Sequence, residues 1–91
     1  MLDKPRKEIN QIDKEILKLL EKRYVCVDEV VRIKKENNIP TLDTSREKEV
    51  ISNLSSMVTK EEYEESILET FQSIMDISKK YQNNKKEEAV T

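Results

Sequence analysis

The sequence predicts an all-α fold with one long N-terminal helix followed by two shorter helices. Its 91 residues include no glycine and only two prolines, although the turns and hairpins of β-sheets normally use glycine. Lysine, glutamate, isoleucine and leucine are abundant, and this composition favours helices. In the N-terminal third, apolar residues recur every seven positions, as they do in a helix that packs along one face.

The first helix is expected to run from about residue 3 to about residue 35. Asp3 would cap its N-terminus, and Pro5 suits the first turn, where a missing N–H has no helical partner. Two asparagines followed by Pro40 would end it, because asparagine tolerates the left-handed conformation and proline cannot continue a helix. Such a helix is ~45 Å long.

Two capping-box patterns predict where the shorter helices begin. Thr44 is followed three residues later by Glu47, and Thr59 is followed in the same way by Glu62. The apolar face of the second helix would comprise Val50, Ile51 and Leu54. The apolar face of the third would comprise Tyr63, Ile67, Leu68, Phe71, Ile74, Met75 and Ile77.

The length of the first helix also predicts a partner chain. A helix of ~45 Å is longer than a globule of this mass is wide, so two shorter helices cannot cover its apolar stripe. We therefore expect an intertwined homodimer with a helical-bundle core. Residues 1–83 would form the helical domain, and the polar residues 84–91 would form a frayed or disordered tail.

Composition also limits the partners and the cellular location. The net charge is only −2 although 40% of the residues are charged, so no excess of basic charge is present to bind nucleic acid. We find no apolar run of transmembrane length and no N-terminal signal segment, which predicts a cytosolic protein with no membrane contact. The single cysteine, Cys26, lies in an apolar series with Leu19 and Ile33 and is expected to be a buried small hydrophobe.

An arginine interrupts the apolar pattern of the first helix. In the series Ile9, Ile16, Arg23, Val30, the third member is a cation, and a buried cation requires an anion as its partner. Lys34 lies eleven residues after Arg23 and so returns to nearly the same helix face, ~16 Å away. The two side chains could bracket a small dianion, although such cations also commonly reach solvent or pair with carboxylates.

The usual catalytic groups are missing. The chain has no histidine, no cysteine cluster, no glycine-rich phosphate loop and no serine elbow. The remaining candidates are cations and hydrogen-bonding groups: Arg6, Arg23, Lys34, Asp43, Arg46, Glu47, Ser78 and Gln82. Arg6 lies ~25 Å from Arg23 along one straight helix, so it can serve the same site only from the other subunit of an antiparallel pair.

Taken together, the spacing of these candidates resembles the all-helical, type II chorismate mutase family. The resemblance covers the chain up to Gln82, with no motif in residues 52–66. Its motifs are Arg6 ahead of the first apolar series, LLEKR ending at Arg23, VVRIKK with Lys34, IPTLDTSRE with Asp43, Arg46 and Glu47, and FQSIMDISKKYQ with Ser78 and Gln82. Each motif is weak alone, but their consistent spacing in one short helical chain is specific.

The resemblance implies that the chain catalyses the rearrangement of chorismate to prephenate, a step of phenylalanine and tyrosine biosynthesis. It also implies that the reaction needs no cofactor, no metal and no covalent intermediate. Arg23 and the partner subunit's Arg6 would bind the two carboxylates of the substrate. Lys34 and Gln82 would donate hydrogen bonds to the ether oxygen. Glu47 would accept a hydrogen bond from the ring hydroxyl, and Asp43 and Arg46 would shape that end of the pocket. Ser78 would support a carboxylate.

Two other functions remain open from the sequence. An isochorismate pyruvate lyase shares the scaffold and several of the cations, although the presence of both Asp43 and Glu47 favours the mutase. The chain could also be a non-catalytic helical dimerisation module, in which the cations pair across the interface.

Overall fold

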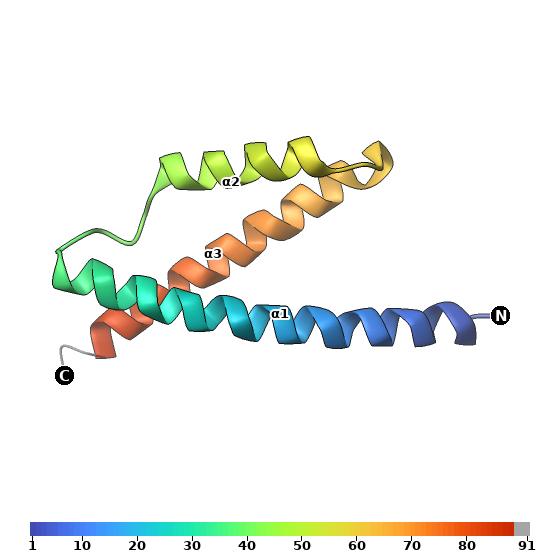
Figure 1. Cartoon of the computed structure of the whole chain (residues 1–91), viewed down its shortest axis with the longest axis horizontal. Coiled ribbons are helices and arrows are strands. Elements are labelled where there is room, and N and C mark those ends of the chain that lie inside the picture. The colour runs from blue at the N-terminus through green and yellow to red at the C-terminus, as the bar shows by residue number, and fades with distance from the viewer. Residues whose placement is uncertain (89–91) are drawn as a thin grey trace.

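The computed structural model describes residues 1–88, which form three α-helices and one short 3-10 helix (Figure 1). The elements in chain order are α1 at Asp3–Glu36, α2 at Thr44–Met57, η1 at Glu61–Tyr63 and α3 at Glu64–Glu88. These residues contain no strand, so the predicted all-α class is confirmed. In this part of the chain, no helix has the length and apolar character needed to cross a membrane.

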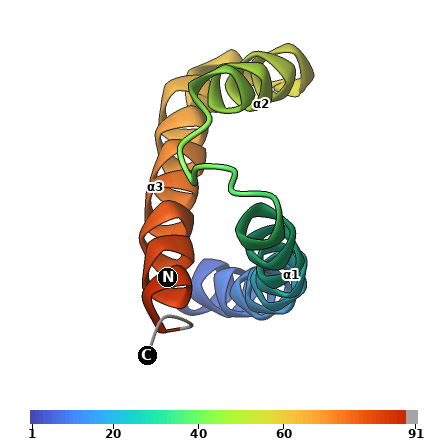
Figure 2. The ribbon, with the colours of Figure 1, turned by 90° about the vertical axis from the view of Figure 1, so that its left-hand side faces the viewer.

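The three helices form an open arrangement in which α3 is the central element. It packs against both α1 and α2, and Figure 2 shows α1 and α2 toward opposite ends of α3. The molecule is 53 Å long, and α1 lies along this dimension (Figure 1). A space between α1 and α2 is therefore bounded by α3 on one side.

The start of α1 differs from the prediction, whereas its end agrees with it. Asp3 is the first helical residue and not the cap; Leu2 occupies the cap position without a side-chain hydrogen bond. At the other end, Asn37 donates a hydrogen bond from Nδ2 to the carbonyl oxygen of Ile33 at 2.8 Å. Asn38 adopts a left-handed conformation with φ of 53°, which asparagine tolerates better than most residues.

The helix α2 begins at the predicted residue, Thr44, but its capping residue differs from the prediction, and the start predicted at Thr59 is wrong. Asp43, and not Thr44, caps α2, because its carboxylate accepts the backbone N–H of Arg46 at 3.0 Å. Aspartate one residue before threonine thus takes the capping role. Thr59 caps no helix, since an extended Lys60 leads into η1 before α3 begins at Glu64.

Residues 84–88 of the predicted tail are helical and not frayed, whereas the domain boundary at residue 83 stays a prediction. The helix α3 continues to Glu88, and residues 89–91 lie outside the described part of the chain. Lys86 donates a hydrogen bond to the carbonyl oxygen of Ile39 at 2.9 Å, and Lys35 of α1 donates one to the carbonyl oxygen of Lys85 at 3.0 Å. These contacts tie the polar end of α3 to α1 and to the α1–α2 loop.

The buried core is small and lies where α1 crosses α3. Val27 and Val31 of α1 and Met75 of α3 are buried. Nearby, the rings of Tyr24 and Tyr81 meet edge to face with their centroids 5.0 Å apart. The buried apolar side chains therefore come from α1 and α3, and α2 contributes none of them.

The N-terminal half of α1 is exposed in the structure. Its large apolar side chains are exposed: Ile9, Ile12, Ile16, Leu17 and Leu19 are each between 47% and 61% accessible. An apolar stripe of this kind is typical of a surface that binds another protein chain.

The burial of Val31 leads to a stability prediction. Val31→Ala removes two methyl groups and leaves a cavity between α1 and α3, so the free energy of unfolding should fall by ~2 kcal/mol. Urea unfolding at a fixed protein concentration measures this loss. Val25→Ala is the matched control, because Val25 lies on the same helix but is 71% exposed; it should cost less than ~0.5 kcal/mol. Equal losses would contradict the assigned core.

Candidate active site

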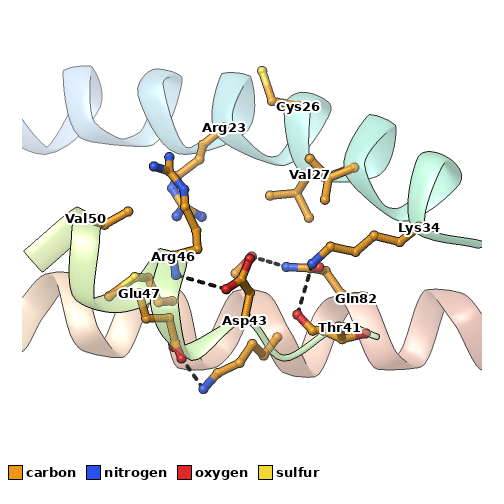
Figure 3. Close-up of a pocket in the computed structure, with 14 residues that line it drawn as sticks. Arg23, Cys26, Val27, Lys34, Thr41, Asp43, Arg46, Glu47, Val50 and Gln82 are labelled. Atoms are coloured by element: carbon orange, nitrogen blue, oxygen red, sulfur yellow. Dashed lines mark hydrogen bonds and ion pairs between the residues drawn. The ribbon is translucent and has the colours of Figure 1, made fainter. Parts of the chain in front are cut away.

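A pocket of about 290 Å³ lies between α1, the α1–α2 loop, the start of α2 and the C-terminal half of α3 (Figure 3). Its volume is close to the lower limit of ~300 Å³ for ligand pockets. Seven of the eight site residues predicted from the sequence line it: Arg23, Lys34, Asp43, Arg46, Glu47, Ser78 and Gln82. Thus residues from all three helices converge on one cavity.

The wall formed by α1 holds two cations above an apolar patch. Arg23 and Lys34 reach from α1 into the space between the helices (Figure 3). Val27 and Val30 also line the pocket and lie between the two cations in the sequence of α1. Both cations are half-buried. The ammonium group of Lys34 donates a hydrogen bond to the carbonyl oxygen of Thr41 at 3.0 Å, which holds it over the pocket.

The start of α2 supplies charged groups of both signs. Asp43 uses a carboxylate oxygen to cap the helix, so its side chain is fixed at the pocket wall. The guanidinium of Arg46 donates a hydrogen bond to Glu49 at 3.2 Å, and this pair is exposed. Glu47 is largely shielded and forms an ion pair with Lys79 of α3 at 3.0 Å.

Two polar side chains on α3 are buried in the site. Ser78 is 3% exposed and Gln82 is 9% exposed. They lie one helical turn apart, so the amide Nε2 of Gln82 can donate to the Ser78 hydroxyl oxygen at 3.2 Å. This bond leaves the amide oxygen of Gln82 without a partner.

Unpartnered buried atoms show where the pocket can receive a ligand. Among the described residues, four buried side-chain atoms have no hydrogen-bond partner: Arg23 Nη1, Thr41 Oγ1, Glu47 Oε1 and Gln82 Oε1. Of these, Glu47 Oε1 still has the ammonium group of Lys79 at 3.0 Å as its ion-pair partner. Buried polar atoms normally have partners, and an unpaired guanidinium nitrogen is best satisfied by an anion such as a carboxylate. With Lys34 on the same wall, the pocket is suited to a small dianion.

Arg6 is the one predicted site residue that does not line the pocket. It is exposed and lies on the first turns of α1, seventeen residues before Arg23. Along an α-helix this separation is ~25 Å, which no arginine side chain spans. The chain itself therefore cannot bring Arg6 and Arg23 to one small ligand.

The pocket also contains polar residues that the sequence analysis missed, namely Lys79 and Thr41. The spacing on α3 offered a signal for Lys79, which directly follows Ser78 and lies three residues before Gln82. The neighbouring carboxylate of Glu47 raises the pKa of the lysine. No comparable sequence signal marked Thr41, because its place depends on the path of the α1–α2 loop.

Cys26 corrects another expectation. It was predicted to be buried, but it is exposed in the chain, and its sulfur points away from the other pocket side chains in Figure 3. The reason is the small core: α3 covers α1 along the line of Val27 and Val31, and Cys26 lies beside this line.

Comparison with known proteins shows the family of the chain. The chain matches the family described as chorismate mutase type II over residues 5–83. It is 32% identical to a chorismate mutase from Methanocaldococcus jannaschii over 84 residues, which cover 91% of this chain and 85% of the relative. No solved structure matches the chain significantly. The family match covers most of each helix and every residue that lines the pocket, and the chain therefore belongs to the type II chorismate mutase family.

Proposed function

We propose that this pocket is the active site and that it binds chorismate, a dianion, between Arg23 and Lys34. As a member of its family the chain is an isomerase, which converts chorismate to prephenate. The observation that supports the site assignment most strongly is the unpaired, buried Nη1 of Arg23 in the same cavity as Lys34. This pair supplies positive charge for a ligand with two carboxylates.

The reaction suits a site without acid–base groups. Within one molecule an ether C–O bond breaks while a C–C bond forms, so atoms and electrons balance without a proton transfer or a second reactant. The protein has to hold the substrate in the compact conformer and stabilise the negative charge that develops on the ether oxygen. Fixed cations and amide groups in a shielded pocket can do both.

The proposed roles follow from where the side chains lie. Arg23 binds one carboxylate through the nitrogen that now lacks a partner. Lys34, held beside the α1–α2 loop, donates to the ether oxygen as negative charge develops there. At the other wall Glu47 accepts a hydrogen bond from the ring hydroxyl, while Asp43 and Arg46 shape that end of the pocket.

Gln82 must turn its amide to donate to the ether oxygen. In the structure its Nε2 donates to Ser78, and its oxygen lacks a partner. A half-turn of the amide would direct Nε2 into the pocket and leave the oxygen to accept the Ser78 hydroxyl proton. Since Ser78 is almost fully buried against Gln82, we assign it to holding this amide and not to binding a carboxylate directly.

We further propose that the enzyme is a homodimer in which the partner subunit's Arg6 binds the second carboxylate. Two features support this proposal: the exposed apolar stripe on the N-terminal half of α1, and the ~25 Å between Arg6 and Arg23 in one chain. Antiparallel packing of two α1 helices would cover the stripe and carry each Arg6 toward the other subunit's pocket. The cytosolic location expected from the sequence stays a prediction.

The activity should change little between pH 6 and 8. The chain has no histidine, and the charged residue types that line the pocket ordinarily titrate outside this range. The ion pair of Lys79 with Glu47 should also stay intact between pH 6 and 8. Because the pKa of Lys79 is raised, this pair is complete below the ordinary lysine pKa and is lost only as the pH rises through the raised pKa. Measurement of kcat and kcat/KM across this range checks the prediction; a steep change would point to a titrating group outside the proposed set.

Product analysis of the purified chain tests the proposed function. The chain is incubated separately with chorismate and with isochorismate, and the products are identified by nuclear magnetic resonance. We expect prephenate from chorismate and no pyruvate from isochorismate. Release of pyruvate from isochorismate would instead support the lyase. If the chain consumes neither compound, the result would support the non-catalytic dimerisation module.

A further inference from the structure

Lys79 occupies a position in the pocket for which neither the sequence motifs nor the proposed mechanism gives a role. It lies on α3 between Ser78 and Gln82, and its side chain lines the cavity. Its ammonium group forms an ion pair with Glu47 of α2 at 3.0 Å and a longer one with Asp76 at 3.4 Å. The pair with Glu47 thus connects α2 to α3 at the pocket wall.

The burial of the two ion pairs differs. The side chains of Lys79 and Glu47 are 29% and 19% exposed, whereas that of Asp76 is 56% exposed. Asp76 also accepts a hydrogen bond from Gln72 at 3.0 Å, so it has a second partner. Because solvent screens exposed charges more strongly than shielded ones, Glu47 is the more important partner of Lys79.

The charge of Glu47 creates a problem for a site that binds a dianion. An unpaired carboxylate on the pocket wall would repel both carboxylates of the ligand. The ammonium group of Lys79 offsets this charge from a distance of 3.0 Å. Glu47 can then act as a hydrogen-bond acceptor without excluding the substrate.

The ion pair also restricts the orientation of Glu47. Lys79 contacts Oε1 of the carboxylate, and a carboxylate has a second oxygen with free acceptor positions. A carboxylate held through one oxygen loses little rotational freedom when the other oxygen accepts a substrate hydroxyl.

We propose that Lys79 is a positioning residue, which holds and neutralises Glu47 so that this carboxylate can accept the substrate's ring hydroxyl in a pocket that binds a dianion. This inference rests on the proposed function of the pocket. It assigns Lys79 no contact with the reacting atoms.

Substitution of Lys79 tests the inference through steady-state kinetics on chorismate. Lys79→Met should lower kcat/KM about tenfold, mainly by raising KM, because repulsion and disorder of Glu47 weaken ground-state and transition-state binding alike. Lys79→Gln should lower it to a similar extent, since the amide carries no charge. Lys79→Arg should remain within about threefold of the unchanged chain, because the cation is kept.

A double-mutant cycle with Glu47→Gln separates positioning from direct contact with the ligand. If Lys79 acts through Glu47, Lys79→Met should change kcat/KM less than about twofold once Glu47 is neutral. A tenfold loss in both backgrounds would overturn the inference, because Lys79 would then act on the ligand itself. Asp76→Asn is the matched control: it removes the exposed partner of Lys79 outside the pocket and should leave the kinetics unchanged.

The outcomes distinguish failure of this inference from failure of the proposed function. If the unchanged chain does not convert chorismate, the function is wrong. Suppose instead that the unchanged chain converts chorismate. If Lys79→Met and Lys79→Gln then have the same kcat/KM as the unchanged chain, and thermal unfolding shows that both are folded, only the proposed role of Lys79 is wrong. If the Met variant does not fold, the comparison of Lys79→Gln with Lys79→Arg still decides the result, because they differ in charge.

Discussion

Replacing Lys34 with alanine is expected to lower kcat by about a hundredfold or more, which corresponds to ~3 kcal/mol of transition-state stabilisation. Lys34 is half-buried on the α1 wall, and its ammonium group is held by the carbonyl oxygen of Thr41 at 3.0 Å. In a shielded pocket, a fixed cation stabilises developing negative charge more than it would in water. Its effect should therefore appear mainly in kcat.

The control for this variant is another lysine of the same chain. Lys80→Ala removes an exposed lysine of α3 that does not line the pocket, so kcat and KM should be unchanged. Circular dichroism of both variants checks that the helices remain. If the Lys34→Ala enzyme has a nearly unchanged kcat, Lys34 has no role in the mechanism.

Mixing two inactive variants is expected to restore activity. Arg6→Ala and Arg23→Ala should each abolish most turnover, because each leaves one carboxylate of the substrate without its guanidinium partner. In a mixed dimer, one site lacks both arginines and the other has both. With random exchange of subunits, about one quarter of all sites should regain full function.

The mixing experiment needs proof that subunits exchange. Mass spectrometry of the intact dimer detects the mixed species when one variant carries a heavy-isotope label. Activity should rise in step with the mixed species. If mixed dimers form and turnover does not recover, the partner subunit's Arg6 does not complete the site.

The long first helix and most of the pocket could be predicted because they depend on helical periodicity. The spacing of Arg23 and Lys34 on α1 fixes their common face whatever the rest of the chain does. The end of α1 was also predictable, because Asn38 takes the left-handed conformation that its residue type tolerates. The predicted pairing of Arg6 with this site still depends on a second subunit.

The errors concern features that tertiary contacts decide. Asp43 and Thr44 are both good capping residues, and the path of the loop selects Asp43. The polar end of α3 remains helical because Lys86 bonds to the backbone of the α1–α2 loop, which composition alone does not reveal. Likewise, the role of Lys79 depends on how close α2 and α3 approach at Glu47.

A crystal structure with a stable dicarboxylate that mimics the transition state tests the proposed site most directly. Such an analogue should bind tightly, because the site is complementary to the transition state. We predict one analogue per pocket, with one carboxylate on Arg23, the other on the partner subunit's Arg6, and Lys34 bonded to the ether oxygen. An analogue bound elsewhere, or bound in this pocket without a second subunit's arginine, would contradict the proposed site.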